Sequence, residues 1–292
     1  MMVQAVDSRS VDSGAQAREP RPGVLRRYPQ FTISPTILVA LLVAWWLATD
    51  VLNTPGYIVP PPQDVLRAAV GGLSRSPWDK AGYWYHAAIT VWEAVLGFAI
   101  GSALGACLGL VLSHWPILGK SWYPYIVGFQ SLPKVALAPL MVVWFGFGLE
   151  GKVFITAIIT FFPVLVNMMA GYQAVEPERI ELARSCNASE LDLLTKIIIP
   201  SCLPFLFAGL GVASVLSILG AVVGEFVGAS AGLGMLLTQY NQAMEISPMF
   251  AVILLLAVLG FLMNYAVGLV ERRYCFWAQR ANAMARTDWD RP

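Results

Sequence analysis

The sequence predicts an all-α protein that crosses a membrane several times. Hydrophobic residues make up 57% of the 292-residue chain and charged residues only 13%, against about 25% charged residues in a typical soluble domain. The mean hydropathy is +0.64, and the apolar residues gather in nearly uncharged runs of about 20 residues, the length of a helix that crosses a bilayer. This composition excludes a soluble enzyme and a disordered chain. The runs are also too long for the strands of a membrane barrel.

Six apolar runs are expected to cross the membrane as helices, because backbone groups in lipid must form their hydrogen bonds within the segment. The runs cover approximately residues 33–52, 89–112, 123–147, 153–170, 197–223 and 250–270. Glu93 is the single charge in the second run and Lys134 the single charge in the third, and the last three runs carry none.

Lys and Arg residues are distributed unevenly around these runs. Fourteen of the 19 lie on the side of the N-terminus, four lie on the opposite side, and Lys134 lies within a run. Basic residues favour the cytoplasmic side, so both termini are predicted to be cytoplasmic. Residues 1–32 are then a disordered cytoplasmic tail, residues 33–271 the transmembrane domain and residues 272–292 a cytoplasmic C-terminal tail. Residues 64–73 are predicted to form a short amphipathic helix on the membrane surface.

No segment has the residue spacing of a metal or nucleotide site. The four cysteines and two histidines lack metal-ligand spacing. Gly119-Lys120-Ser121 would end a phosphate-binding loop, but His114 stands where that motif needs its first glycine. We therefore expect that the chain is not an enzyme and that it binds no metal and no cofactor of its own.

The loop over residues 172–196, called the charged loop below, is unusually rich in charge, with eight charged residues in 25 positions. Residues 179–184 have the composition of a short helix, Asn187 interrupts it, and Ser189 is suited to cap a second short helix over residues 189–196. Residue chemistry alone leaves two readings open, an ordinary solvated loop or a rigid projection that contacts a partner.

The spacing within the charged loop resembles the EAA loop of importer-type ATP-binding-cassette (ABC) permeases. That pattern runs Glu-Ala-Ala, three residues, Gly, nine residues, Ile-x-Leu-Pro. The matching positions here are Glu181, Ala183, Asn187, Ile197, Ile199 and Pro200. Leu182 replaces the middle alanine, Ile199 replaces leucine, and Asn187 replaces glycine; asparagine is the residue next best suited to a left-handed helix end. By this resemblance Glu181, Ala183, Arg184, Asn187, Ile197 and Pro200 couple the chain to an ATPase.

Three further segments resemble the nitrate/sulfonate/taurine branch of these permeases. They are residues 132–148, Phe161-Phe-Pro163, and Glu225-Phe-Val-Gly228 followed by Gly232-Leu-Gly234. The resemblance covers about residues 35–275 and implies a six-helix, MetI-like permease fold in the bacterial inner membrane. It also implies a second permease copy, two ABC ATPase subunits that use ATP and Mg²⁺, and a periplasmic or lipid-anchored solute-binding protein, with no nucleic-acid partner.

Two further sets of residues are expected to serve helix packing and a translocation pathway. Gly97, Gly101, Gly105 and Gly109 recur every four residues, which predicts close helix packing within the subunit or a face that moves during transport. Candidate residues of a translocation pathway are Lys134, Pro139, Ser214, Ser217 and Glu225. Lys134 either faces the pathway or only snorkels or pairs with a carboxylate. The two serines either line the pathway or bond to the carbonyl four residues before, and Glu225 is a candidate for an outer gate.

The function predicted is that of the membrane-spanning permease subunit of an ATP-driven, binding-protein-dependent importer. Lys134 favours a small anion, and the resemblance implies nitrate, a sulfonate, taurine, an aromatic carboxylate or a pyrimidine-type solute. The alternative is a stand-alone secondary transporter, which should show inverted repeats. An intramembrane enzyme is a third possibility, but neither histidine is placed within a membrane run next to a serine.

Overall fold

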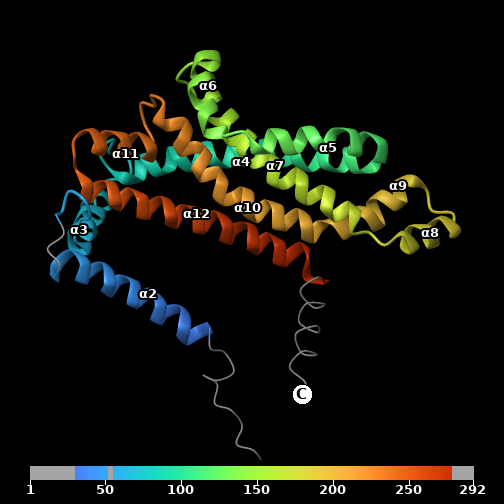
Figure 1. Cartoon of the computed structure of the whole chain (residues 1–292), viewed down its shortest axis with the longest axis horizontal. Coiled ribbons are helices and arrows are strands. Elements are labelled where there is room, and N and C mark those ends of the chain that lie inside the picture. Colours follow the sequence, from blue (N-terminus) through green and yellow to red (C-terminus); the bar gives the residue numbers. More distant parts are fainter. Residues whose placement is uncertain (1–29, 52–54, 278–292) are drawn as a thin grey trace, which may run out of the picture. The chain divides into compact units, whose positions relative to one another are not determined.

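The computed structural model describes residues 30–51 and 55–277, and every regular element in these ranges is a helix (Figure 1). The predicted N-terminal tail falls almost entirely outside the described residues, as does most of the C-terminal tail. The chain forms two units, residues 1–53 and 54–292, and each is described by itself.

Residues 30–51, the described part of the first unit, contain one apolar helix. Helix α2 spans Gln30–Trp46 and a π-helical turn, η1, continues it over Leu47–Val51. Large apolar side chains such as Ile37, Leu38 and Leu41 are exposed in it, as suits a helix in lipid. This is the first predicted run, although its apolar helix over Pro35–Val51 is shorter than the other candidate spans.

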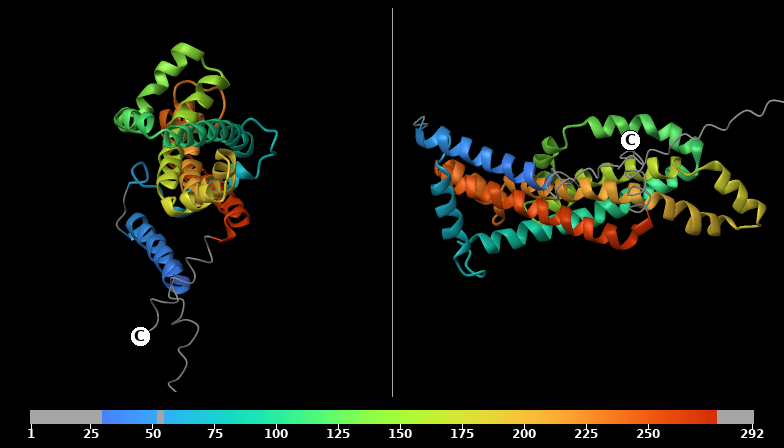
Figure 2. Two further views of the ribbon diagram at one scale, coloured as in Figure 1. Left: turned by 90° about the vertical axis from the view of Figure 1, so that its right-hand side faces the viewer. Right: turned by 90° about the horizontal axis from the view of Figure 1, so that it is seen from below.

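The described part of the second unit, residues 55–277, contains four helices that are long and apolar enough to cross a membrane. They are α4 (Tyr83–His114), α7 (Leu149–Gln173), the helical segment that ends in α10 (Ile199–Phe226), and α12 (Ile246–Tyr274). These helices lie side by side along the unit (Figures 1 and 2). They correspond to the second, fourth, fifth and sixth predicted runs.

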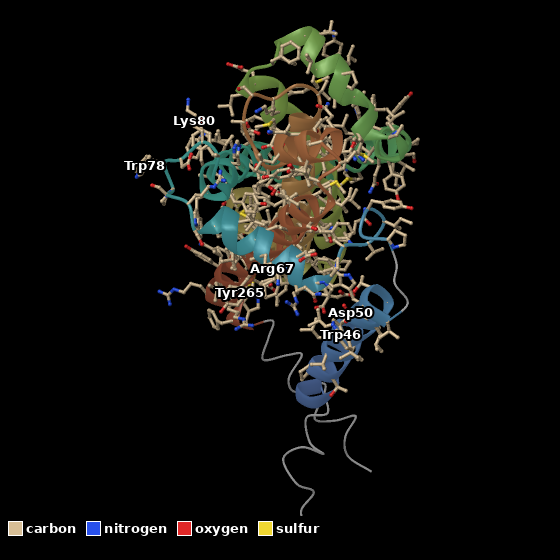
Figure 3. The ribbon with its side chains drawn as sticks, turned by 90° about the vertical axis from the view of Figure 1, so that its left-hand side faces the viewer. Trp46, Asp50, Arg67, Trp78, Lys80 and Tyr265 are labelled. Atoms are coloured by element: carbon tan, nitrogen blue, oxygen red, sulfur yellow. The ribbon has the colours of Figure 1, made fainter. Side chains whose placement is uncertain are left out.

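Shorter helices connect and extend these four. The predicted amphipathic helix is present as α3 (Pro62–Leu73). In the loop between α3 and α4, Trp78 is 89% exposed and projects away from the ribbon (Figure 3). The charged loop contains α8 (Pro177–Ser185), α9 (Glu190–Leu193) and the π-helical turn η3 (Leu194–Ile198). Helix α11 (Leu233–Gln242) lies between α10 and α12.

The third predicted run is not one straight helix. Helix α5 (Pro116–Ser131) is followed by a short 3-10 turn, η2 (Lys134–Leu137), and by α6 (Ala138–Phe145), with a bend of 79° between the two parts. Pro133 explains the break, because its ring excludes the helical conformation at Leu132, whose ψ is 138°. Counting the bent pair as one span gives five spans in the described residues by length and composition; six spans and cytoplasmic termini remain predictions.

The core of the second unit is the packing of α4 against α7 and of α7 against α10. The four predicted glycines all lie on the face of α4 that meets α7. A Cβ atom added at Gly105 would lie 2.5 Å from the carbonyl oxygen of Phe161. One added at Gly109 would lie 2.8 Å from the carbonyl oxygen of Leu165. Only glycine permits so close an approach of the two backbones.

Candidate functional site

Helix α8 ends in a Schellman motif, which gives the charged loop a defined shape. The N–H of Ala188 donates to the Ala183 carbonyl at 3.1 Å, and the N–H of Asn187 donates to the Arg184 carbonyl at 3.0 Å. Asn187 has a φ of 58°, the left-handed conformation that this motif requires. The prediction that Asn187 takes a left-handed conformation is confirmed, and its part in coupling stays a prediction.

The next helix begins with the predicted cap at Ser189. The Asp192 N–H donates to Ser189 Oγ at 3.2 Å, and the Ser189 N–H donates to Asp192 Oδ2 at 3.3 Å, which completes a capping box. Lys196 Nζ lies 2.6 Å from Asp192 Oδ1. The hydrogen bonds from Lys196 and then from Ser189 hold the pKa of Asp192 well below its usual range. Asp192 is therefore charged at neutral pH, and the cap persists.

The predicted coupling residues divide between the exposed surface of the charged loop and its base. Glu181 and Arg184 are exposed on α8, and Arg184 Nη2 lies 3.2 Å from Glu190 Oε1, which links α8 to α9. Ala183, Ile197 and Pro200 are half-buried. These three help to line a groove of about 690 Å³, together with Leu182, Cys186 and Trp277.

Apolar side chains add to the exposed surface of the charged loop. Leu182 is 68% exposed and Leu191 is 73% exposed. The sequence predicts Leu191, Leu193 and Leu194 as the apolar side of the second helix, but only Leu193 is buried, at 1% exposure, and Leu194 is half-buried. Leu182 and Leu191 are therefore exposed on the charged loop beside its charged side chains.

The candidate pathway residues lie in different parts of the fold. Lys134 lies at the break between α5 and α6, where its Nζ donates to the Gln130 carbonyl at 3.0 Å and lies 5.0 Å from the centre of the Phe162 ring. Pro139 is exposed in the first turn of α6. Ser214 and Ser217 are fully buried in α10.

The two serines bond to their own helix. Ser214 Oγ donates to the Gly211 carbonyl and Ser217 Oγ to the Ser214 carbonyl, both at 2.7 Å. These carbonyls are three residues before each serine, not the expected four. A role for either serine in a pathway stays a prediction.

Glu225, near the end of α10, is 1% exposed and holds the start of α11. Its Oε2 accepts the N–H of Gly234 at 2.5 Å, and its Oε1 accepts the hydroxyl of Thr90 at 2.7 Å. At Gly232, where φ is 127°, a Cβ atom would collide with the Glu225 carboxylate. This close approach is the physical reason for a glycine at position 232 of the Gly232-Leu-Gly234 motif.

Two residues of α4 complete this arrangement. The Leu233 N–H donates to Thr90 Oγ1 at 2.8 Å, and the Gly232 N–H donates to His86 Nδ1 at 3.0 Å. His86 Nε2 lies 2.8 Å from the Lys80 carbonyl, so the ring proton is on Nε2 and the imidazole is neutral. Three successive N–H groups at the start of α11 are thus bound by His86, Thr90 and Glu225, which we call the α11 clamp.

Sequence reasoning selected Glu225 and the glycines but missed His86 and Thr90. A signal for them exists on α4, because His86, Thr90 and Glu93 follow each other at intervals of four and three residues and therefore share one helix face. Glu93 is bound by Lys152 of α7, with 2.6 Å between Nζ and Oε1, and the side chains are 3% and 12% exposed.

Comparison with known proteins identifies the family. Residues 97–274 match the family model described as "Binding-protein-dependent transport system inner membrane component". The chain is 32% identical over 243 residues to a probable ABC transporter permease protein of Haemophilus influenzae, which covers 83% of this chain and 96% of the relative. It is also 32% identical over 259 residues to the riboflavin transport system permease protein of Chloroflexus aurantiacus. This match covers 88% of this chain and 95% of the relative.

Solved structures agree on the fold. A chain of the MetNI methionine ABC transporter in an inward-facing conformation matches with a TM-score of 0.54 at 21% identity, covering 72% of this chain and 97% of that chain. This likeness shows a MetI-like fold. The family match extends over more than half of the sequence, and the relatives are named as permeases, so this chain belongs to the inner membrane components of binding-protein-dependent transport systems and is an ABC importer permease.

Proposed function

We propose that this permease is driven by two separate ABC ATPase subunits, which bind the charged loop and use ATP and Mg²⁺. The observation that carries this proposal is the Schellman turn at Asn187, which occupies the glycine position of the EAA pattern with a φ of 58°. The turn and the capping box fix α8 and α9 as a rigid projection. The exposed charges and leucines of this projection suit contact with a protein partner.

The complete importer would contain two copies of this chain and a solute-binding protein. In this proposal the chain spans the bacterial inner membrane with both termini and the charged loop in the cytoplasm, as the distribution of Lys and Arg supports. The binding protein would dock on the opposite side. Lys134, Pro139, Ser214, Ser217 and Glu225 remain the proposed residues of the pathway or its gate.

The transported solute is proposed to be a small anion. Lys134 supports this, because it lies at a break in a membrane helix and, among the described residues, forms no ion pair within 4.0 Å. The relatives are named for riboflavin, formylaminopyrimidine, taurine and aliphatic sulfonates. Taurine and aliphatic sulfonates carry the tetrahedral sulfonate group that a lysine would attract.

The proposal is tested with the permease, its ATPase and its solute-binding protein reconstituted in proteoliposomes. Uptake should require ATP and should stop with vanadate, and Glu181→Lys should abolish uptake while the protein still inserts in the membrane. Glu150→Lys is the control, because Glu150 is an exposed carboxylate that lies outside the charged loop. Uptake driven by an ion gradient without ATP would overturn the proposal in favour of a secondary transporter.

A further inference from the structure

One helical segment joins the charged loop to the α11 clamp. Residues Glu190–Phe226 form a single helical segment of 37 residues, which is roughly 55 Å long at the rise of an α-helix. Ser189 caps its first turn within the charged loop, and Glu225 lies at its last turn. Figure 1 shows α8 and α9 at one end of this unit and α11 at the other.

The covalent link between α10 and α11 does not by itself fix α11. Gly228 and Gly232 both have φ values in the left-handed region, at 109° and 127°, and glycine leaves such a connection conformationally free. Packing of α11 on α12, α10 and α4 holds it in place, and the clamp adds a polar link between α4, α10 and α11, because Thr90 bonds both to the Leu233 N–H and to the Glu225 carboxylate. Movement of α10 relative to α4 must therefore move or break these bonds.

The face of α11 away from the clamp is open. Gln239, Asn241 and Gln242 are exposed, and Met244 is 71% exposed in the turn that follows. Residues 226–248 contain no Lys or Arg and one Glu, Glu245. This uncharged polar surface is therefore rigidly attached, through the clamp, to the segment that carries the charged loop at its other end.

We propose that His86, Thr90 and Glu225 are positioning residues that transmit docking of the solute-binding protein on α11 to the charged loop through α10. This rests on the proposed function, in which the ATPase binds the charged loop. Coupling is reciprocal. Binding-protein docking stimulates ATP hydrolysis through the clamp, and ATP-driven movement of the charged loop shifts α11.

Thr90→Val tests the proposal with little change of shape, because valine replaces the hydroxyl with a methyl group and removes the two bonds that Thr90 makes in the clamp, to the Leu233 N–H and to Glu225. Thr90→Ser keeps the hydroxyl and is the matched control. In the reconstituted importer, Thr90→Val should lower the stimulation of ATP hydrolysis by solute-loaded binding protein by ~10-fold, within the usual range of coupling energies. Thr90→Ser should retain it.

His86 supplies a second, independent pair of variants. Asparagine places an amide oxygen close to the position of Nδ1, so His86→Asn should keep the bond from the Gly232 N–H, whereas His86→Leu cannot accept it. His86→Leu should lose stimulation and His86→Asn should keep most of it. Wild-type stimulation in both Thr90→Val and His86→Leu would overturn the proposal.

A distance measurement separates failure of this proposal from failure of the proposed function. The exposed native cysteines are first removed by Cys107→Ala and Cys186→Ser. Spin labels at Gln242→Cys and Trp84→Cys, both exposed positions, then report the position of α11 against α4 without any partner. The distance distribution should be narrow in the otherwise wild-type permease and broad with Thr90→Val. An equally narrow distribution in both would overturn the clamp even if ATP-dependent uptake is intact. If Thr90→Val broadens the distribution but the wild-type importer shows no ATP-dependent uptake, the clamp is supported and the proposed function is rejected.

Discussion

Lys152 Nζ lies 2.6 Å from Glu93 Oε1 and joins the first turn of α7 to α4 with little access to solvent. The other carboxylate oxygen of Glu93 is buried and has no hydrogen-bond partner among the described residues. The lysine is therefore the main compensation for a carboxylate held within the helix bundle.

The first prediction is that this pair is strongly coupled. Lys152→Met leaves a buried carboxylate without its cation and should cost about 3–5 kcal/mol of stability. The double variant Lys152→Met with Glu93→Gln should recover much of this loss, because neither buried charge remains. Thermal unfolding of the detergent-purified single and double variants measures the effect, and additive losses would contradict the coupling.

The second prediction concerns Asn187. Because its φ is 58°, Asn187→Gly should be tolerated, whereas Asn187→Val places a β-branched side chain at positive φ, at a cost of about 1–3 kcal/mol. The valine variant should lose ATP-dependent uptake and binding of the ATPase, which co-purification can follow. If glycine and valine variants transport equally well, the left-handed turn has no part in coupling.

The third prediction concerns the close contact between α4 and α7. A methyl group at Gly101 would collide with Thr160 and the Ala157 carbonyl, so Gly101→Ala should destabilise the protein by about 1–3 kcal/mol through overpacking. Gly128→Ala in α5 is the control, because no atom lies within 4 Å of the added Cβ. That change should be neutral or should stabilise the helix by up to about 1 kcal/mol. Equal melting temperatures for the two variants would refute the packing argument.

The fourth prediction concerns Lys134. Its ammonium donates to the Gln130 carbonyl, and no carboxylate of the described residues lies within ion-pair distance. Lys134→Met therefore leaves no carboxylate without a partner and should leave the melting temperature nearly unchanged. If the lysine attracts an anionic solute, Lys134→Met should lower uptake and Lys134→Arg should retain part of it. Wild-type uptake by Lys134→Met would remove the support for an anion.

Much of the candidate coupling site could be predicted from sequence, because its structure is local. The Schellman turn at Asn187 and the capping box at Ser189 are formed by residues within five positions of each other. Local hydrogen bonds depend on residue type and spacing, which sequence displays directly. The family resemblance relied on the same spacing and was confirmed by the family match.

The long apolar helices were predictable for a similar reason, since a membrane helix must be apolar along its whole length. Pro133 indicates an interruption of helix hydrogen bonding in the third run, but the sharp bend was not predicted, because a proline can kink a helix or end it and the choice depends on the packing of both parts. The leucines of α9 show the same limit. Residues two positions apart lie on nearly opposite faces of a helix, so Leu191 and Leu193 cannot share one apolar side, and the tertiary packing decided that Leu193 is the buried one.

The sequence by itself determined the membrane class, the apolar helices and the shape of the charged loop, because each depends on composition or on neighbours within a few residues. Only the tertiary structure decided the α11 clamp. Thr90 and Glu225 are 135 residues apart in sequence, and His86 is 146 residues from Gly232. Contacts at such separations depend on how α4, α7 and α10 pack, and the close backbone approach that the four glycines of α4 permit sets that packing.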